Sequence, residues 1–215
     1  MNQDIGRQYV QYGCGICAPP EWENFDASPT LRIQKMPLLG KLFQSRLNVV
    51  FPSNVRYGNI IKGLPVQDNF FWGAYCSHTL EHLSYSELPN ALHNTYKILR
   101  EGSIFRCVVP DFEYSANEYI NGLNNGNADA SKIFMESTLL GVYKRPRGWR
   151  SYAEFAWGNS RHLWMWDYLS LSKELSKAGF TQIRRCSFGD CADQMFKLVE
   201  DKGRFEHALA IECVK

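Results

Sequence analysis

The sequence predicts an α/β domain in which helices cover both faces of a mostly parallel sheet. Short β-prone runs alternate with segments of helical periodicity along most of the chain, and this alternation is typical of parallel sheets. The run 70–76, FFWGAYC, is apolar at nearly every position, as expected of a central strand with both faces buried. Crossovers in such sheets are right-handed, and ligands bind beyond the carboxyl ends of the strands.

Size and composition indicate a single domain that spans residues 1–215. The chain has 215 residues, of which 45% are hydrophobic, 14% aromatic and 21% charged, as in a compact globular protein. The formal charge of +2 is too small to imply a polyanionic partner. We therefore expect no nucleic acid partner.

The expected location is the cytoplasm. No apolar run is long enough to cross a bilayer, and residues 1–13 lack the pattern of a signal peptide. The seven cysteines are then expected as reduced thiols rather than as a disulfide framework.

Two short strands are predicted at the start of the chain, over residues 9–12 and 22–25. The first ends at Gly13-Cys14-Gly15 and the second at Asp26, both of which are turn sequences. Residues 18–20, Ala-Pro-Pro, disfavour a long helix between them. Residues 30–47 have a weak helical pattern, and 55–61 are a candidate third strand.

The fourth strand, 70–76, is followed by the clearest helix of the sequence. Ser84 and Glu87 have the spacing of a capping box, and an apolar stripe runs from Leu88 to Leu99. Gly102 is the expected end of this helix. Residues 104–109 then form the predicted fifth strand, closed by Pro110-Asp111.

The last third of the chain has a less regular pattern. Residues 112–161 are helical in character, with an Asn/Gly-rich turn at 121–127. Another helix is expected from Tyr168 to Ala178, ended by Gly179. Residues 181–188 and 207–214 are the last predicted strands.

Gly13, Gly15 and Asp26 together indicate a nucleoside site. The glycines allow a sharp turn and a close approach of a ligand to the backbone. A carboxylate at the end of the next strand can accept hydrogen bonds from both ribose hydroxyls.

Several segments, taken in order, resemble a known family. They are YVQYGCG, WENFDASP, KGLPVQDNFFWGAYCSHTLEHL, NTYKILREGSIFRCVVPDFE and HLWMWDYLSLSKELSKAGF. With this order the sequence is similar to the class I S-adenosylmethionine-dependent methyltransferases, and in particular to the branch described as methyltransferase type 11-like. The resemblance covers the chain from about residue 9 to its end.

The resemblance implies a Rossmann-like sheet of seven strands, the last antiparallel, with S-adenosyl-L-methionine as cofactor and S-adenosyl-L-homocysteine as product. It places an acceptor-side helical insertion at about 112–166. Asp26 would bind the ribose, Asn59 the adenine, and Ser77 and His78 the methionine side. The implied cofactor-binding residues are Tyr12, Gly13, Cys14, Gly15, Asp26, Asn59, Ile60, Cys76, Ser77 and His78.

The sequence also departs from the family pattern. Cys17 replaces the third glycine, and no helix is evident between the first two strands. Asn59 stands where an aspartate is usual, which affects the adenine contact. Trp72 and the sequence Glu101-Gly102-Ser103 also differ from the family pattern. We expect these two differences to affect the fold and not cofactor binding.

The sequence contains two motifs with the spacing of metal ligands. Neither is our favoured interpretation, so we expect no metal. His78-Thr79-Leu80-Glu81-His82 has the H-x-x-E-H spacing of a zinc-peptidase class. In the methyltransferase reading, Glu81 and His82 instead fix the start of the following helix, and no convincing further ligand is identified. Cys14 and Cys17 with Cys186 and Cys191 form a second, loosely spaced combination.

His78, His162 and Asp111 are the candidate catalytic residues. Methyl transfer to a hydroxyl requires a base with a pKa near the working pH, and histidine titrates closest to neutrality. The alternatives are a structural hydrogen-bonding role for each histidine and a helix cap for Asp111. The aromatic and basic stretch 143–152 is either an acceptor-binding segment or a solvated loop.

The expected function is methyl transfer to an O or N atom of a small-molecule or sugar-linked acceptor, such as a glycan precursor. Two alternatives stay open. One is a protein of the same fold that binds the nucleoside or the cofactor without turnover, and the other is a zinc hydrolase that uses His78, Glu81 and His82.

Overall fold

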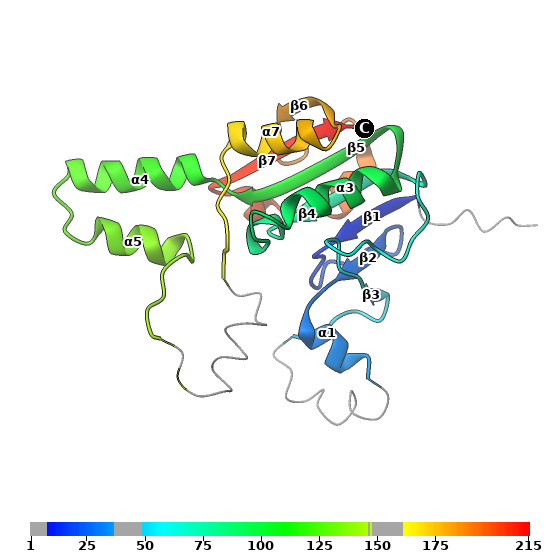
Figure 1. The fold of residues 1–215 in the computed structure, drawn as a ribbon, viewed down its shortest axis with the longest axis horizontal. Helices are drawn as coiled ribbons and strands as arrows, with labels where there is room; N and C mark the ends of the chain where they lie inside the picture. Colours follow the sequence, from blue (N-terminus) through cyan, green and yellow to red (C-terminus); the bar gives the residue numbers. More distant parts are fainter. Residues whose placement is uncertain (1–7, 37–48, 146, 148–160) are drawn as a thin grey trace, which may run out of the picture.

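A computed structural model describes residues 8–36, 49–145, 147 and 161–215. Its centre is a seven-stranded sheet in the order β3-β2-β1-β4-β5-β7-β6. The strands are β1 (Tyr9–Tyr12), β2 (Glu23–Asp26), β3 (Val55–Tyr57), β4 (Phe71–Ser77), β5 (Leu99–Pro110), β6 (Thr181–Arg185) and β7 (Ala208–Val214). Only β7 runs antiparallel to its neighbours, so the predicted α/β fold with an antiparallel last strand is confirmed (Figure 1).

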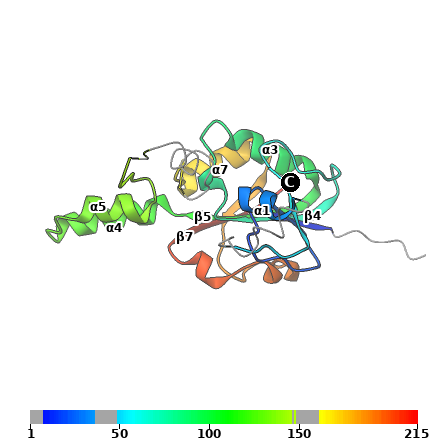
Figure 2. The same ribbon diagram turned by 90° about the horizontal axis from the view of Figure 1, so that it is seen from below.

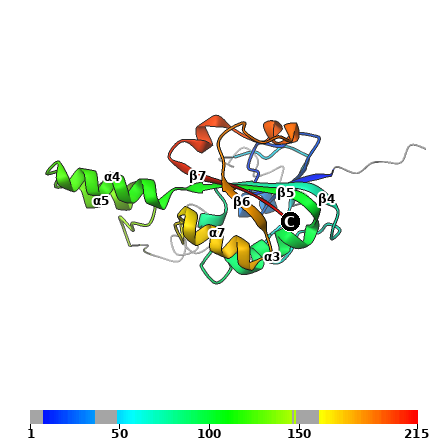
Figure 3. The same cartoon turned by 90° about the horizontal axis from the view of Figure 1, so that it is seen from above.

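The two faces of the sheet are covered by different parts of the chain. Helices α3 (Leu88–Ile98) and α7 (Tyr168–Lys177) lie on one face, and the β6–β7 connection lies on the other (Figures 2 and 3). That connection contains the 3-10 helices η3 (Gln194–Leu198) and η4 (Lys202–Phe205). The two faces thus have separate apolar cores.

The connection between β1 and β2, residues 13–22, contains no helix, as the sequence predicted. The face that a helix would cover is filled by Trp22, which is fully buried and packs on Phe196 of η3. The indole nitrogen of Trp22 donates to the Met195 carbonyl at 3.2 Å. The β6–β7 connection therefore takes the place of the missing helix.

Helix α3 is confirmed, but its end differs from the prediction. Ser84 donates both its N–H and its hydroxyl to the Glu87 carboxylate at 2.8 Å, which forms part of the expected capping box. The helix ends at Ile98, because Leu99 is already extended and pairs with Phe71 of β4. Gly102, with φ of +76°, lies inside β5 and does not end the helix.

The region after β5 forms two helices, α4 (Phe112–Asn124) and α5 (Ala130–Ser137). They pack on each other and extend away from the sheet (Figure 1). The turn between them begins after Asn124, later than the predicted start at Asn121, because residues 121–124 remain helical. Most of the predicted aromatic and basic stretch 143–152 lies outside the described residues.

Two early elements are shorter than predicted. Helix α1 (Pro29–Gln34) occupies the start of the predicted 30–47 segment, and residues 37–47 lie outside the described part of the chain. Strand β3 ends at Tyr57, because residues 59–63 form a turn in which the Asn59 side-chain oxygen accepts from the Ile61 N–H. Among the described residues, no helix has the length and apolar character needed to span a membrane.

Arg106 of β5 links β5, β7 and the β6–β7 connection on the same face as Trp22. Its side chain is only 1% exposed and contacts Glu200, Asp190 and Glu212 at 2.7, 2.9 and 2.5 Å. Glu200 is fully buried as well. Removing the arginine or one of its carboxylate partners would leave a buried charge without compensation, which is strongly destabilising.

Candidate cofactor and acceptor site

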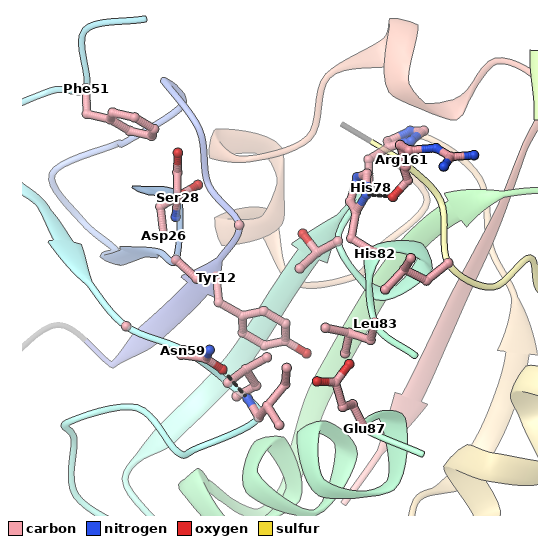
Figure 4. A pocket seen from close by; sticks show the side chains of 17 residues that line it. Tyr12, Asp26, Ser28, Phe51, Asn59, His78, His82, Leu83, Glu87 and Arg161 are labelled. Carbon is pink, nitrogen blue, oxygen red and sulfur yellow. Dashed lines mark hydrogen bonds between the residues drawn. The ribbon is translucent and has the colours of Figure 1, made fainter. Parts of the chain in front are cut away.

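Strands β1 to β4 end around a cavity of about 490 Å³. This volume is in the usual range for a small-molecule site. Figure 4 shows Asp26 and Ser28 on one side, His78, His82 and Arg161 on the other, and the Tyr12 ring between them. The lining residues are Tyr12, Gly13, Asp26, Ala27, Ser28, Phe51, Gly58, Asn59, Ile60, Ile61, His78, Thr79, His82, Leu83, Glu87, Arg161 and Leu163.

Gly13 is the residue at which the chain turns after β1. Its φ is +66°, and a Cβ at this position would lie 2.0 Å from Thr79 Oγ1. No side chain larger than hydrogen fits without a shift of Thr79. The end of β1 and the loop after β4 therefore approach each other directly at the cavity.

Asp26, at the end of β2, holds the loop after β1. One carboxylate oxygen accepts the Gly15 N–H at 3.0 Å, and the other accepts the Ser28 N–H at 2.7 Å. A carboxylate has about four lone-pair sites, so each oxygen retains acceptor capacity. Asp26 lines the cavity although it is only 8% exposed.

Tyr12, Asn59 and Ile60 also line the cavity, as expected for cofactor-binding residues. The Tyr12 hydroxyl is directed into the protein, where it lies 3.0 Å from Thr95 Oγ1. The ring, rather than the hydroxyl, is thus offered to a ligand. The Asn59 oxygen is engaged with the Ile61 N–H, which leaves the amide N–H groups as the donors for a ligand.

Four of the expected cofactor residues do not line this cavity. Cys14 is buried against Leu31 and Val55 in a small apolar cluster, and Cys76 belongs to the main core. Gly15 acts indirectly, because its N–H donates a hydrogen bond to Asp26, which does line the cavity. Ser77 contributes through its carbonyl, which accepts from Thr79. These positions were assigned from proximity in sequence, whereas side-chain direction decides which residues face the ligand.

His78 follows β4 and lies at the boundary of two cavities. Its backbone is in the left-handed region, with φ of +50°, and its Nε2 lies 3.0 Å from the Arg204 carbonyl oxygen. Burial lowers its pKa, but the Glu81 carboxylate and the Arg204 carbonyl outweigh this, so the pKa is raised overall.

The second cavity, of about 760 Å³, lies beyond the end of β5 and against α4 and α5. Aromatic, amide and carboxylate side chains surround it. The lining residues are His78, Pro110, Tyr114, Ser115, Glu118, Tyr119, Asn121, Gly122, Asn125, Asn127, Ala130, Ile133, Phe134, Ser137, Leu139, His162, Met165, Glu206 and His207.

Of the other two candidate bases, His162 lines the second cavity and Asp111 does not. Burial lowers the pKa of His162. Asp111 caps α4 by accepting the Glu113 N–H at 2.9 Å, and it lies 3.6 Å from Arg185. The structure therefore gives Asp111 the capping role, and its carboxylate lines neither cavity.

The H-x-x-E-H segment does not form a helix that carries two metal ligands on one face. His78 precedes a single 3-10 turn, η2 (Leu80–His82), and α3 begins only at Leu88. The zinc-peptidase geometry is thus absent, and Glu81 and His82 do not begin α3. Instead, the Glu81 carbonyl accepts from the Leu163 N–H at 2.7 Å and positions the segment around His162.

His162 joins Glu81 and His82 in one cluster, and this was missed from the sequence. Glu81, His82 and His162 have ligand atoms within 4.8 Å of one another. His162 is far from the other two in sequence, and hydrogen bonds from residues 163 and 164 to the Glu81 carbonyl, with that between His82 and the Arg161 carbonyl, bring it to them. Among the described residues, this is the sole group of three such side chains, so the four cysteines of the second metal pattern are not gathered, and all seven cysteines are free thiols.

Comparisons with known proteins identify the fold. No protein-family model and no curated protein sequence matches the chain. A SAM-dependent methyltransferase from Thermotoga maritima is similar with a TM-score of 0.50 and 16% identity, over 97% of this chain and 82% of that one. PigF in complex with SAH is similar with a TM-score of 0.50 and 14% identity, over 97% of this chain and 50% of that one. This chain therefore has the Rossmann-like fold of the class I S-adenosylmethionine-dependent methyltransferases.

Proposed function

We propose that the protein is an S-adenosylmethionine-dependent methyltransferase that transfers a methyl group to an O or N atom of a small molecule or glycan precursor. The observation that carries this proposal is the pair of cavities that meet at His78. One lies at the strand ends where ligands bind in this type of sheet. The other has the size and mixed lining of an acceptor site.

The first cavity fits an adenosyl group. Asp26 offers carboxylate lone pairs for the ribose hydroxyls, and Asn59 offers amide donors for the ring nitrogens of adenine. Tyr12 and Ile60 supply an apolar surface beside them. In this proposal Gly13 keeps the space free where the Cβ of any other residue would meet Thr79.

Arg204 is the proposed partner of the cofactor's carboxylate. In a helix after β1, free N–H groups would attract an anion, but this chain has no helix there. Arg204 of η4 comes from the segment that replaces it, and its guanidinium donates to the Ser77 carbonyl at 3.3 Å. It thus lies beside the loop after β4, next to the cavities but outside their linings.

A bound S-adenosylmethionine would supply an activated methyl group, so the chain has mainly to orient the acceptor. Alignment of this kind contributes about 7–11 kcal/mol to lowering a barrier. For a hydroxyl acceptor, His162 is the proposed base. It lines the acceptor cavity, and burial lowers its pKa, so its imidazole is neutral at pH 7 and can accept a proton.

The acceptor cavity favours a polar small molecule over a flat apolar one. Tyr114, Tyr119 and Phe134 offer ring surfaces, and Glu118 and Asn121 offer hydrogen-bonding groups. Such a mixture suits a sugar or a polar ring, which presents hydroxyls at its edge and C–H groups on its face. A cytoplasmic location remains a prediction from the sequence.

Calorimetric titration with S-adenosylhomocysteine tests the cofactor assignment. Asp26→Asn keeps the shape of the side chain and removes its charge, and we expect about ten- to a hundredfold weaker binding, since a hydrogen bond to a charged group contributes about 1.5–3 kcal/mol. Asp68→Asn is the matched control, because Asp68 is a surface carboxylate paired with Lys97 at 3.1 Å. Equal affinities of Asp26→Asn and the unaltered protein would contradict the proposal.

A second candidate is a protein that binds the cofactor without turnover. The helix-free connection between β1 and β2 favours it, since fewer backbone N–H groups hold the methionine end. Incubation with methyl-labelled S-adenosylmethionine and a panel of sugar nucleotides, phenols and amines separates the two. Label in any acceptor supports the enzyme, whereas tight cofactor binding without label in the whole panel supports the second candidate.

A further inference from the structure

Glu81 is a buried carboxylate without a conventional partner. Its side chain is 1% exposed, and among the described residues neither carboxylate oxygen accepts a hydrogen bond. No lysine or arginine in that part of the chain lies within ion-pair distance of it. An ionised carboxylate without compensation is strongly destabilising in such a place, so the surroundings of Glu81 require a positive charge.

Three of the five histidines of the chain surround this carboxylate. Glu81 Oε1 lies 3.4 Å from His78 Nδ1, 4.0 Å from His82 Nε2 and 4.0 Å from His162 Nε2. The rings of His82 and His162 are 5.2 Å apart between centroids. Four side chains from two distant segments therefore converge on one point.

The outer ring nitrogens of two of these histidines are held by backbone carbonyls. His78 Nε2 lies 3.0 Å from the Arg204 oxygen, and His82 Nδ1 lies 2.7 Å from the Arg161 oxygen. A carbonyl only accepts, so these nitrogens carry the hydrogen. In neutral rings the other nitrogen of each histidine then turns a lone pair toward Glu81.

Lone pairs that face a carboxylate repel it unless a proton or a metal ion lies between them. Histidines that bind metals have this same arrangement, in which the second nitrogen donates to a carbonyl and thereby fixes the tautomer. The third imidazole, His162, has a side chain that is only 8% exposed, so it lies buried beside the carboxylate.

We propose that His78, Glu81, His82 and His162 bind a divalent first-row transition-metal ion. Three imidazoles and one carboxylate are donors that suit zinc and its neighbours in the series. The ligand atoms of Glu81, His82 and His162 lie within 4.8 Å of one another, so small rotations of the side chains bring them to coordination distance.

The position of this centre gives it a role in the proposed methyl transfer, and this part rests on the proposed function. His78 and His82 line the cofactor cavity, while His78 and His162 line the acceptor cavity. An ion among them lies at the boundary of the two cavities. There it can bind an acceptor oxygen, orient it toward the first cavity and lower the pKa of its hydroxyl, so that the proton is lost to solvent. In the metal-bound protein His162 is a ligand, and the ion takes over the activation of the hydroxyl that His162 would otherwise perform as a base.

Metal binding is tested directly on the full chain, after treatment with EDTA and dialysis. We expect calorimetry to show one Zn²⁺ or Co²⁺ per chain, and Co²⁺ to give visible absorption bands of a nitrogen- and oxygen-ligated site. Glu81→Gln and His162→Ala should weaken binding by about a hundredfold or more, since even outer-sphere changes weaken metal sites ten- to a hundredfold. His93→Ala, which removes an exposed histidine of α3, should bind the metal normally.

Failure to bind either ion stoichiometrically would overturn the proposal, and so would equal affinities of the two cluster variants and His93→Ala. A melting curve in EDTA shows whether each variant is folded, and His162→Gln replaces His162→Ala if the latter is not. The S-adenosylhomocysteine titration, carried out in EDTA, reports on the cofactor site alone. A loss of cofactor binding and a loss of metal binding are thereby distinguished.

Discussion

Gly13 and Thr79 leave no space for a side chain between the end of β1 and the loop after β4. A Cβ on residue 13 would lie 2.0 Å from Thr79 Oγ1 and 3.1 Å from Thr79 Cβ. Gly15, two residues later, also has a positive φ of +55°, but its Cβ position is open. The two glycines therefore differ in their contacts and share the same backbone requirement.

We predict that Gly13→Ala is more damaging than Gly15→Ala. The left-handed conformation alone destabilises either variant by about 1–3 kcal/mol. At residue 13 the collision with Thr79 adds to this and moves the loop that closes the proposed cofactor cavity. Urea unfolding should show the larger loss of stability for Gly13→Ala, and S-adenosylhomocysteine titration the larger loss of affinity. Equal losses in the two variants would contradict the prediction, because they would mean that Thr79 moves aside at no measurable cost.

A second prediction concerns Arg204 and uses two ligands that differ in the methionine part. Arg204→Gln should weaken S-adenosylhomocysteine binding about two- to fivefold, the effect of an exposed ion pair. Adenosine, which has no carboxylate, should bind the variant and the unaltered protein equally. Lys202→Gln is the control, because Lys202 is an exposed cation in the same 3-10 helix. Parallel losses for both ligands would indicate a structural role for Arg204.

The parts of the fold that could be predicted from the sequence depend on local patterns. Strand β4 has a continuous apolar run, and α7 has both an apolar stripe and Gly179 at its end, with φ of +104°. The end of α3 could not be predicted, because the pairing of Leu99 with Phe71 outweighs the local preference for a helix end at Gly102.

The sequence predicted those site residues whose position at the end of a strand is enough to place them at the cavity. Gly13 and Asp26 line the cavity as the sequence indicated. Cys14 and Cys76 do not, since neighbouring residues in an extended chain face opposite sides. The contact of His162 with Glu81 depends on a chain path of many residues, and no pattern in the sequence specifies it.

The third prediction tests the buried charges around Arg106. Arg106→Met leaves the fully buried Glu200 without its cation, and removal of one partner from a buried set destabilises by about 3–5 kcal/mol. Arg184→Met is the matched control, because Arg184 contacts the same Asp190 and Glu212 from a side chain that is 44% exposed. Its loss should stay below about 1 kcal/mol. Urea unfolding measures both, and similar losses would contradict the prediction.

The fourth prediction is a loss of stability in acid that depends on Glu212. Burial raises the pKa of Glu212, but its hydrogen bonds to Arg106, Cys191 and Arg184 outweigh this and hold the pKa below its ordinary value of 4.5. Burial likewise raises the pKa of Asp190, but hydrogen bonds from Arg184, the Ser187 N–H and Arg106 outweigh this and lower it overall. A lowered folded pKa means that the unfolded chain binds the proton first as the pH falls.

The stabilisation from these carboxylates is therefore complete above about pH 5 and is lost as the pH falls through the folded pKa values. Urea unfolding at intervals from pH 6 to pH 3 should show a constant free energy at first and then a steep decrease. In Glu212→Gln the group that titrates is absent, so the free energy should be lower at pH 6 and should decrease less steeply below pH 5. An unchanged slope in this variant would assign the acid sensitivity to other carboxylates.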